Sequence, residues 1–387
     1  MTDHIPEELL AFYQDLHSHP ELSSKEHRTM EKIAAQLTAW GIECTPGLAG
    51  TGVIATLKGN RPGRTIGIRA DIDALPIPEE TGLPYASENA GVMHACGHDV
   101  HTTILMGAAK ALKDLDGDFP GTMRLIFQPA EESGTPMGAF AMIEQGCLED
   151  PHVDHVIGLH VEPNLPTGTV GLRYGKFYAG ADRVHLIVHG VSSHGARPHQ
   201  GIDAIVVAAH IITAIQTIIS RRTAPTESAL ISFGTIQGGN AGNQICDRVE
   251  LTGIIRTLTP EAKENTFRRV KELAESVAAG MEASVEVLRF PAYPPLINDD
   301  TVVRASEDLF TEMLGAEHVY VEPVPEMCAE DFAYYAMERP SCFYHLGCLG
   351  EGQEQHPLHS CFFQPDLACI PVGIELQVAL AKRLAEL

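Results

Sequence analysis

The stretch HACGHDVHTTILMGAAKALKDL, residues 94–115, joins a cluster of polar side chains to a segment at 100–115 whose composition predicts a helix. Short β-branched or apolar runs that are typical of strands flank it, at 52–57, 65–70, 122–127 and 153–159. Strands separated by helices indicate an α/β fold with a mostly parallel central sheet. Upstream, residues 24–40 have helical spacing, with Ser23 and Glu26 as a predicted capping box and Gly41 just past the end.

A different pattern occupies about 180–293. Its segments alternate as strand, helix, strand, strand, helix and strand, at 184–190, 203–221, 229–236, 248–258, from Pro260, and at 284–290. Thr259 is the expected N-cap of the second helix, because proline is favoured at the first helical position. The order βαββαβ is that of a ferredoxin-like unit.

The proline-rich PAYPP at 291–295 marks the exit from this unit. The chain then returns to predicted helices, near 299–314 and 371–386. We therefore expect an α/β domain built from 1–179 and 295–387, with a smaller α+β domain, 180–294, inserted into it.

The amino-acid composition limits the classes of protein to which the chain can belong. The chain has 387 residues, of which 44% are hydrophobic and 20% charged, and this excludes a mainly disordered chain. Acids outnumber bases by 51 to 27, for a net charge of −24. Such a surface repels phosphate groups, so we expect no nucleic-acid partner and no attraction to anionic membranes.

Two further absences in the sequence suggest a location. No stretch approaches the roughly 20 apolar residues that span a bilayer, and the start, MTDHIPEELLAFYQDL, lacks the features of a secretory signal. Nine cysteines without a CxxC pair favour a cytoplasmic protein with free thiols over a disulfide framework. The C-terminal cysteines are interpreted as packing residues: Cys342, Cys348, Cys361 and Cys369.

The densest chemical signal is HACGHDVH at 94–101. It holds three histidines, a cysteine and an aspartate, which are the ligand types that borderline divalent metals prefer. If the segment is extended, Cys96 and His98 point to the same side and can bind one site. Asp99 could orient a histidine or bridge two metals. The alternative is a polar loop in which Asp99 caps the following helix.

Two neighbouring glutamates, Glu131 and Glu132, follow the apolar strand TMRLIF. On an extended backbone they would face opposite ways, so one could bind metal while the other faces a substrate water. Neighbouring carboxylates raise each other's pKa, and a bound cation would offset that repulsion. The alternative is a solvated acidic turn.

Further candidates stand at the ends of predicted strands. His160 follows the strand VDHVIGL, and His359 lies in HPLHSCF, where His356 competes with it. Binding sites in α/β sheets gather at strand ends, which fits these positions. Asp71 and Asp73 end the strand of GIRADIDALP, and either could orient a metal-bound histidine.

Three polar residues stand out in the inserted unit: His194, Asn243 and Arg256. Histidine and asparagine can donate hydrogen bonds to a developing oxyanion. Arginine can bind a carboxylate through two parallel hydrogen bonds. The alternative is that these three residues are ordinary polar side chains of the protein surface.

With these motifs the sequence resembles the M20 metallopeptidases. It is most similar to their amidohydrolase branch, which includes hippurate hydrolases, N-acetyldiaminopimelate deacetylases and auxin-conjugate hydrolases. The matching segments run in order along nearly the whole chain: RADIDALP (69–76), MHACGHDVHTTILMGAA (93–109), FQPAEES (127–133), GLHVEP (158–163), SSHGARPH (192–199), IIRTL (254–258), AEDFAYY (329–335) and PLHSCF (357–362). The combination of HACGHD with PAEE is specific to this family.

The resemblance implies a two-metal, aminopeptidase-like catalytic domain and an inserted lid domain that forms a homodimer. It implies two divalent ions, with Mn²⁺ or Zn²⁺ expected and Co²⁺ or Ni²⁺ possible, on five ligands: Cys96, His98, Glu132, His160 and His359. Glu131 would be the general base and Asp71 the supporting aspartate, with Asp73 as the alternative. His194 would reach the partner's active site, and Asn243 and Arg256 would hold the substrate.

The implied reaction is hydrolysis of an N-acyl amino acid to a carboxylic acid and an amino acid. A dipeptidase or aminopeptidase of the wider family is the alternative enzyme, and a metal-storing or ligand-binding protein without turnover is the alternative class. Two departures from the family pattern, PAEESGTPMGAF and SSHGARPHQGIDA, leave the substrate open.

Overall fold

The computed structural model describes residues 5–135 and 137–387. The chain divides into two compact units, of which the first comprises 1–175, 297–324 and 331–387. The second, called the inserted unit here, comprises 176–296 and 325–330. The expected insertion, 180–294, lies inside this unit. Residues 176–179, 295–296 and 325–330, which were expected in the first domain, also fall in the inserted unit.

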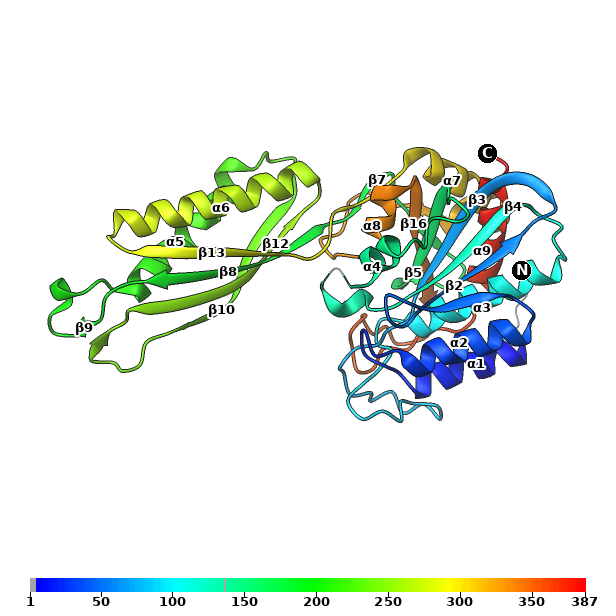
Figure 1. Ribbon diagram of the computed structural model, residues 1–387, viewed down its shortest axis with the longest axis horizontal. Coiled ribbons are helices and arrows are strands. Elements are labelled where there is room, and N and C mark those ends of the chain that lie inside the picture. Colours follow the sequence, from blue (N-terminus) through cyan, green and yellow to red (C-terminus); the bar gives the residue numbers. More distant parts are fainter. Residues whose placement is uncertain (1–4, 136) are drawn as a thin grey trace. The chain divides into compact units, whose positions relative to one another are not determined.

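The first unit is an eight-stranded mixed sheet with helices on its faces (Figure 1). Its helices are α1 (Glu7–Ser18), α2 (His27–Ala39), α3 (His98–Asp114), α4 (Ala139–Glu144), α7 (Asp300–Leu314), α8 (Ala333–Glu338) and α9 (Cys369–Ala385). Its strands are β1 (Cys44–Leu48), β2 (Gly52–Lys58), β3 (Arg61–Asp71), β4 (Pro120–Gln128), β5 (His155–Pro166), β6 (Val170–Leu172), β15 (Val319–Val321) and β16 (Ser341–Leu349). The strand order is β1-β2-β4-β3-β5-β16-β6-β15.

The centre of this sheet is parallel, as expected. Strand β3 pairs in parallel with β4 and β5, and β5 pairs in parallel with β16. The carboxyl ends of these strands therefore meet at one edge, where binding sites of α/β sheets lie. The α/β prediction is confirmed.

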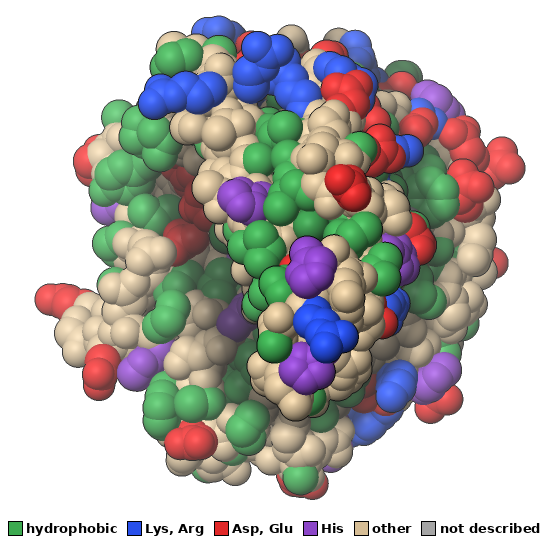
Figure 2. Space-filling view, turned by 90° about the vertical axis from the view of Figure 1, so that its left-hand side faces the viewer, with side chains coloured by type: hydrophobic (Ala, Val, Ile, Leu, Met, Phe, Trp, Pro, Cys, Tyr) green, Lys and Arg blue, Asp and Glu red, His purple; other side chains and the backbone are tan. Residues whose placement is uncertain are grey.

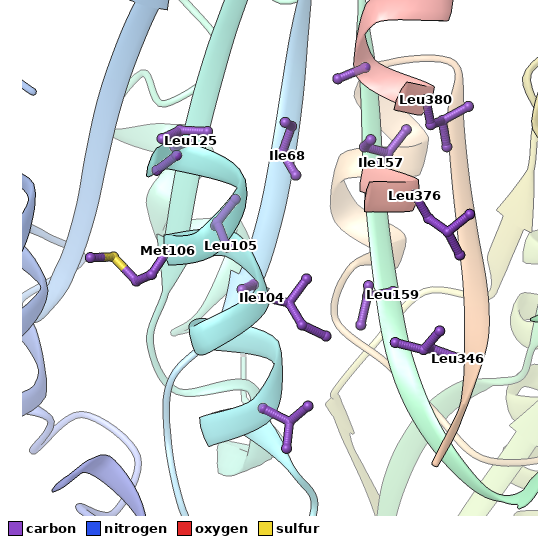
Figure 3. Packing of buried hydrophobic residues seen from close by; sticks show 14 of the residues in the cluster. Ile68, Ile104, Leu105, Met106, Leu125, Ile157, Leu159, Leu346, Leu376 and Leu380 are labelled. Atoms are coloured by element: carbon purple, nitrogen blue, oxygen red, sulfur yellow. The ribbon is translucent and has the colours of Figure 1, made fainter. Parts of the chain in front are cut away.

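Helices α3 and α9 lie on the same face of the sheet and supply much of the core. Apolar side chains of the two helices and of the strands meet there (Figure 3): Ile68, Ile104, Leu105, Leu125, Ile157, Leu159, Leu346, Leu376 and Leu380. The opposite face is covered at Gly158, where an added Cβ would lie 2.7 Å from the ring of Phe332. The central strands are buried on both faces, which holds their carboxyl ends rigidly.

The inserted unit has the predicted βαββαβ order. Its elements are β8 (Gly180–His189), β9 (Ser193–His194), α5 (Ala204–Thr217), β10 (Ala229–Gly238), β11 (Gln244–Ile245), β12 (Arg248–Thr257), α6 (Pro260–Gly280) and β13 (Ser284–Pro291). The sheet order is β10-β12-β8-β13, with antiparallel neighbours throughout. Thr259 caps α6 by accepting from the backbone N–H of Ala262, as expected. Strands β7 (Gly175–Tyr178) and β14 (Leu296–Asn298) lie where the chain enters and leaves the unit.

One helix passes a length and composition test for crossing a membrane. It is α5 with its continuation to Arg222, 19 residues in all. No stretch of this kind was expected from the sequence. One side of it packs into the core of the inserted unit, through Val207, Ala208, Ile211, Ile215 and Ile218. Burial of this side accounts for part of its apolar character, while Ile205 and Val206 are exposed.

The predicted capping box at Ser23 is wrong. Helix α2 begins at His27, and the N-cap residue Glu26 makes no capping hydrogen bond with its side chain. Ser23 Oγ donates instead to Asp73 Oδ2 at 2.6 Å. Tertiary contacts with the sheet have replaced the local capping contacts.

Candidate metal centre

A tight turn and the first residue of α3 place Cys96 and His98. The segment is not extended, because Gly97 between them adopts a φ of +82°. A Cβ on Gly97 would lie 2.5 Å from Val161 Cγ2, so this position requires glycine. Cys96, His98 and His160 nevertheless bring their donor atoms within 4.8 Å of one another.

The two glutamates also stand on a turn rather than on an extended strand. Strand β4 ends at Gln128, and Ala130 takes a left-handed φ of +56° before the 3₁₀ turn Glu131–Ser133. Glu132 groups with Cys96 and His359, and both glutamates group with His98, each set within 4.8 Å. The strained residue thus turns both carboxylates toward one centre.

His160 and His359 come from separate segments of the first unit, one on β5 and one on a loop before α9. The buried His160, on β5, donates through Nδ1 to the carbonyl of Val161 at 2.7 Å, and its Nε2 lies 3.4 Å from Cys96 Sγ. His359 Nε2 lies 3.1 Å from Glu132 Oε1. The backbone N–H of His359 donates to the carbonyl of Ala95 at 2.8 Å, which ties its loop to the turn before α3.

Asp73, rather than Asp71, makes the hydrogen bond to His98. Asp73 Oδ1 accepts from His98 Nδ1 at 3.2 Å, and its Oδ2 accepts from the backbone N–H of Glu132 at 3.0 Å. Asp71 Oδ1 instead accepts from His101 Nδ1 at 2.6 Å, and its other oxygen stays 3.7 Å from His98 Nε2. The family resemblance implied Asp71 as the supporting aspartate, with Asp73 as the alternative.

The negative charges that surround this centre would favour binding of a cation. Burial opposes protonation of His98, yet the nearby carboxylates of Asp71 and Asp73 raise the pKa of His98 to about 10. Burial, with the negative charges of Glu132 and Glu131, raises the pKa of the Cys96 thiol well above its usual range. A bound divalent cation would offset the crowded negative charge and favour the thiolate.

The donor set and its unsatisfied atom fit divalent metal ions. Among the described residues, His98 Nε2 is a buried atom without a hydrogen-bond partner. Imidazole, thiolate and carboxylate together suit borderline divalent ions. Because each Nδ1 of His98 and His160 is engaged by an oxygen, each ring presents Nε2 to the centre.

Asp73→Asn is expected to weaken binding of a divalent ion by about 10- to 100-fold, because the variant loses the carboxylate that orients His98. A competition titration with a chromophoric chelator measures this. The matched variant is Asp71→Asn, for which a smaller loss is expected, since Asp71 makes no hydrogen bond to His98. A larger loss of metal affinity in D71N than in D73N would show that Asp71 is the aspartate that supports the metal site.

In the inserted unit, His194 and Asn243 lie together, and Arg256 lies elsewhere. Strand β9, with His194, pairs with β11, and the N–H of Gly195 donates to the carbonyl of Asn243 at 2.7 Å. His194 Nδ1 accepts from the N–H of Ala196 at 3.0 Å, which leaves Nε2 as the donor. Exposed histidine and arginine side chains gather at this end of the unit (Figure 2).

Arg256 is on β12 of the four-stranded sheet, whereas His194 is on β9 of a separate two-stranded sheet. It pairs with Ala181 at the start of β8, whereas Arg248 pairs with His189 at its end. Eight residues of strand separate the two arginines by roughly 25 Å. Arg256 Nη1 is buried without a hydrogen-bond partner among the described residues. The structure thus does not bring His194 to Arg256 within one inserted unit.

A buried network behind the glutamates was missed from the sequence. The fully buried Arg69 donates to Asp71, to Gln128 and to Asp331 at 2.7–2.9 Å. The backbone N–H of Asp331 donates to Glu131 Oε1 at 3.4 Å. These residues stand inside segments that carry the family resemblance, but only tertiary contacts reveal their role.

Comparisons with known proteins agree with this centre. The chain is 40% identical over 353 residues to an N-acetyl-L-cysteine deacetylase of Bacillus subtilis, covering 91% of this chain and 83% of that one. It is 34% identical to an N-acetyldiaminopimelate deacetylase of Streptococcus pneumoniae, covering 98% and 99%. A crystal structure of a dinuclear metal-binding M20 peptidase from Bacillus subtilis superimposes with a TM-score of 0.84 at 35% identity, covering 98% of each chain. The model of peptidase family M20/M25/M40 matches residues 67–383, and the chain belongs to this family.

Proposed function

We propose that the protein is a metal-dependent amidohydrolase that cleaves N-acyl amino acids to a carboxylic acid and a free amino acid. The observation that carries this proposal is the convergence of five donor residues beside a buried glutamate, from segments spread over positions 96 to 359. Relatives named as deacetylases of N-acetylcysteine and N-acetyldiaminopimelate support the same reaction class.

Two divalent ions would be held by the five donors Cys96, His98, Glu132, His160 and His359. The related dinuclear metal-binding structure and the overlapping donor groups support two ions rather than one. Mn²⁺ or Zn²⁺ suits the mixed donors best, and Co²⁺ or Ni²⁺ is also compatible. When bound, such ions polarise the amide carbonyl and lower the pKa of a water molecule.

Glu131 is assigned the proton transfers. It is buried, and its Oε1 receives a hydrogen bond from the N–H of Asp331, which fixes its direction. Glu131 takes the proton of the attacking water and then passes it to the leaving amine. Asp73 holds the His98 ring and the N–H of Glu132 in place during these steps.

Arg256 and Asn243 are assigned to the substrate. A substrate with a free α-carboxylate must approach a protein with a net charge of −24, so a local cation is required. The half-buried guanidinium of Arg256, with its unpartnered Nη1, suits that carboxylate. Asn243 would hold the acyl end, and His194 Nε2 would donate to the oxyanion.

The separation of His194 from Arg256 supports a homodimer in which each lid, residues 180–294, serves its partner's catalytic domain, residues 1–179 and 295–387. A single lid carries His194 on β9, shortly after the end of β8 that pairs with Arg248, and Arg256 near the other end of β12. Strand β10 has a free edge in the sheet of the inserted unit, which suits pairing with a second copy. We also propose a cytoplasmic location, because nine cysteines without a CxxC pair fit a reducing compartment.

Mixing two inactive variants tests the arrangement in trans. His194→Ala keeps its own metal centre, and Glu131→Gln keeps its own lid histidine, so a hybrid dimer has one complete site. After subunit exchange, activity is expected to return to about a quarter of the wild-type level. A mixture that stays as inactive as its components would show that His194 acts within its own subunit or not at all.

The proposed reaction is tested by product release over a panel of N-acetyl and N-benzoyl amino acids and dipeptides. The panel includes hippurate, N-acetyldiaminopimelate, N-acetylcysteine and aminobenzoyl-glutamate, with Mn²⁺ or Zn²⁺ added. Release from N-acyl amino acids, with slower or no cleavage of dipeptides, is the expected result. Preferential cleavage of dipeptides would favour the peptidase alternative, and no release from any member would contradict an amidohydrolase.

A further inference from the structure

A buried glutamate far from the metal centre in sequence makes contact with the turn that presents Glu131 and Glu132. Glu26 is fully buried, and its side chain does not cap helix α2. Its Oε1 accepts from the backbone N–H of Ala130 at 2.9 Å. The same oxygen accepts from the N–H of Ser24 at 2.9 Å, and Oε2 accepts from Thr51 Oγ1 at 2.6 Å.

Ala130 is a residue whose conformation needs such support. Its φ of +56° lies in the left-handed region, which a non-glycine residue adopts only when its surroundings enforce it. Ala130 directly precedes Glu131, so its backbone angles set the direction in which both carboxylates leave the sheet. The hydrogen bond from the N–H of Ala130 to Glu26 therefore stabilises the residue whose backbone is strained.

A second contact from the same segment reaches the metal centre by another route. Ser23 Oγ donates to Asp73 Oδ2 at 2.6 Å, and that same oxygen accepts from the N–H of Glu132. The backbone N–H of Ala74 donates to the carbonyl of Glu21 at 2.8 Å, which holds the segment against the end of β3. The side chains of Ser23 and Glu26 therefore brace both sides of the turn that carries the glutamates.

We propose that Glu26 is a positioning residue of the active site, which holds Ala130 so that Glu131 reaches the attacking water and Glu132 reaches the cations. This inference rests on the proposed function, since it assigns Glu26 a role in that same reaction. Glu26 touches neither substrate nor metal donors and acts through the backbone of Ala130. The role depends on the hydrogen bonds that Glu26 accepts from Ala130, Ser24 and Thr51.

The test compares substitutions that keep or remove the hydrogen bonds. In Glu26→Gln, Oε1 still accepts from Ala130 and Ser24, and the amide donates to the Thr51 hydroxyl, so kcat is expected to stay within about threefold of wild type. In Glu26→Ala, kcat is expected to fall about 10- to 100-fold, with KM within about twofold, because Glu131 is displaced. Chelator competition is expected to show weaker metal binding in E26A, since Glu132 moves too.

Glu21→Ala is the matched control. Glu21 accepts from the backbone N–H groups of Arg28 and Thr29 at the start of α2 and makes no bond to Ala130. It is expected to lower thermal stability and leave kcat and metal affinity unchanged. If E26A does not fold, Glu26→Asp replaces it, because its carboxylate is one methylene short of Ala130 and the same fall in kcat is expected.

The inference is overturned if E26A and E26D keep wild-type kcat, if E26Q falls as far as they do, or if E21A lowers kcat equally. Failure of the proposed function is recognised separately. The wild-type protein would then release no product from any member of the N-acyl amino acid panel, whatever the Glu26 variants do.

Discussion

Glu131→Gln is expected to lower kcat by about 1,000-fold or more, within the range by which a general base accelerates a reaction. The glutamine keeps the size of the side chain and can still accept from the N–H of Asp331. It cannot take a proton from water, so hydrolysis loses its base while the binding groups remain. Steady-state kinetics on the best N-acyl amino acid measure the loss.

Two further measurements make the E131Q result specific. Metal content is expected to remain at the wild-type value, because the five donors are intact. The control Glu144→Gln changes an exposed carboxylate on α4 and is expected to keep full activity. An E131Q enzyme with more than about a tenth of wild-type kcat would contradict the role of Glu131 as general base.

His160→Ala is the second change with a large expected effect. Its Nε2 lies 3.4 Å from Cys96 Sγ in a buried group with His98, so removing the ring opens the inner side of the metal centre. Loss of one ion is expected, with kcat/KM lower by about 1,000-fold, which corresponds to roughly 4 kcal/mol of transition-state stabilisation. Metal analysis and kinetics on the same sample link the two losses.

A histidine outside the centre provides the control for H160A. His185 lies in the inserted unit, where its Nε2 contacts Glu250 at 2.9 Å. His185→Ala is expected to keep both its metals and its activity. If H160A binds the wild-type amount of metal and turns over normally, His160 is not a ligand.

The alternating order of elements could be predicted because its signals are local. Thr259 and Pro260 mark the start of α6 by capping chemistry alone, and the βαββαβ order follows from segment lengths. Strand β16, Ser341–Leu349, was missed because it is buried along nearly its whole length between β5 and β6. A strand that is covered on both faces shows no alternation of polar and apolar residues.

The candidate metal donors could be named from the sequence because metal chemistry needs their residue types, whereas the residues that support them depend on tertiary distances. Asp71 and Asp73 are two residues apart on one strand, and sequence cannot tell which one reaches His98. Glu26 has the spacing of a capping residue, yet its carboxylate serves Ala130, more than a hundred positions away. The local sequence pattern predicted a helix cap, whereas the observed contact is long-range. No periodic pattern in the sequence could predict that contact.

The central claim is that five side chains from across the chain hold a pair of divalent ions. Elemental analysis of the protein, after saturation with Mn²⁺ or Zn²⁺ and removal of free metal, tests it most directly. Two ions per subunit in the wild-type protein, and fewer in both C96A and H160A, is the predicted result. A wild-type protein that retains no ion, or retains two in both variants, would contradict the account.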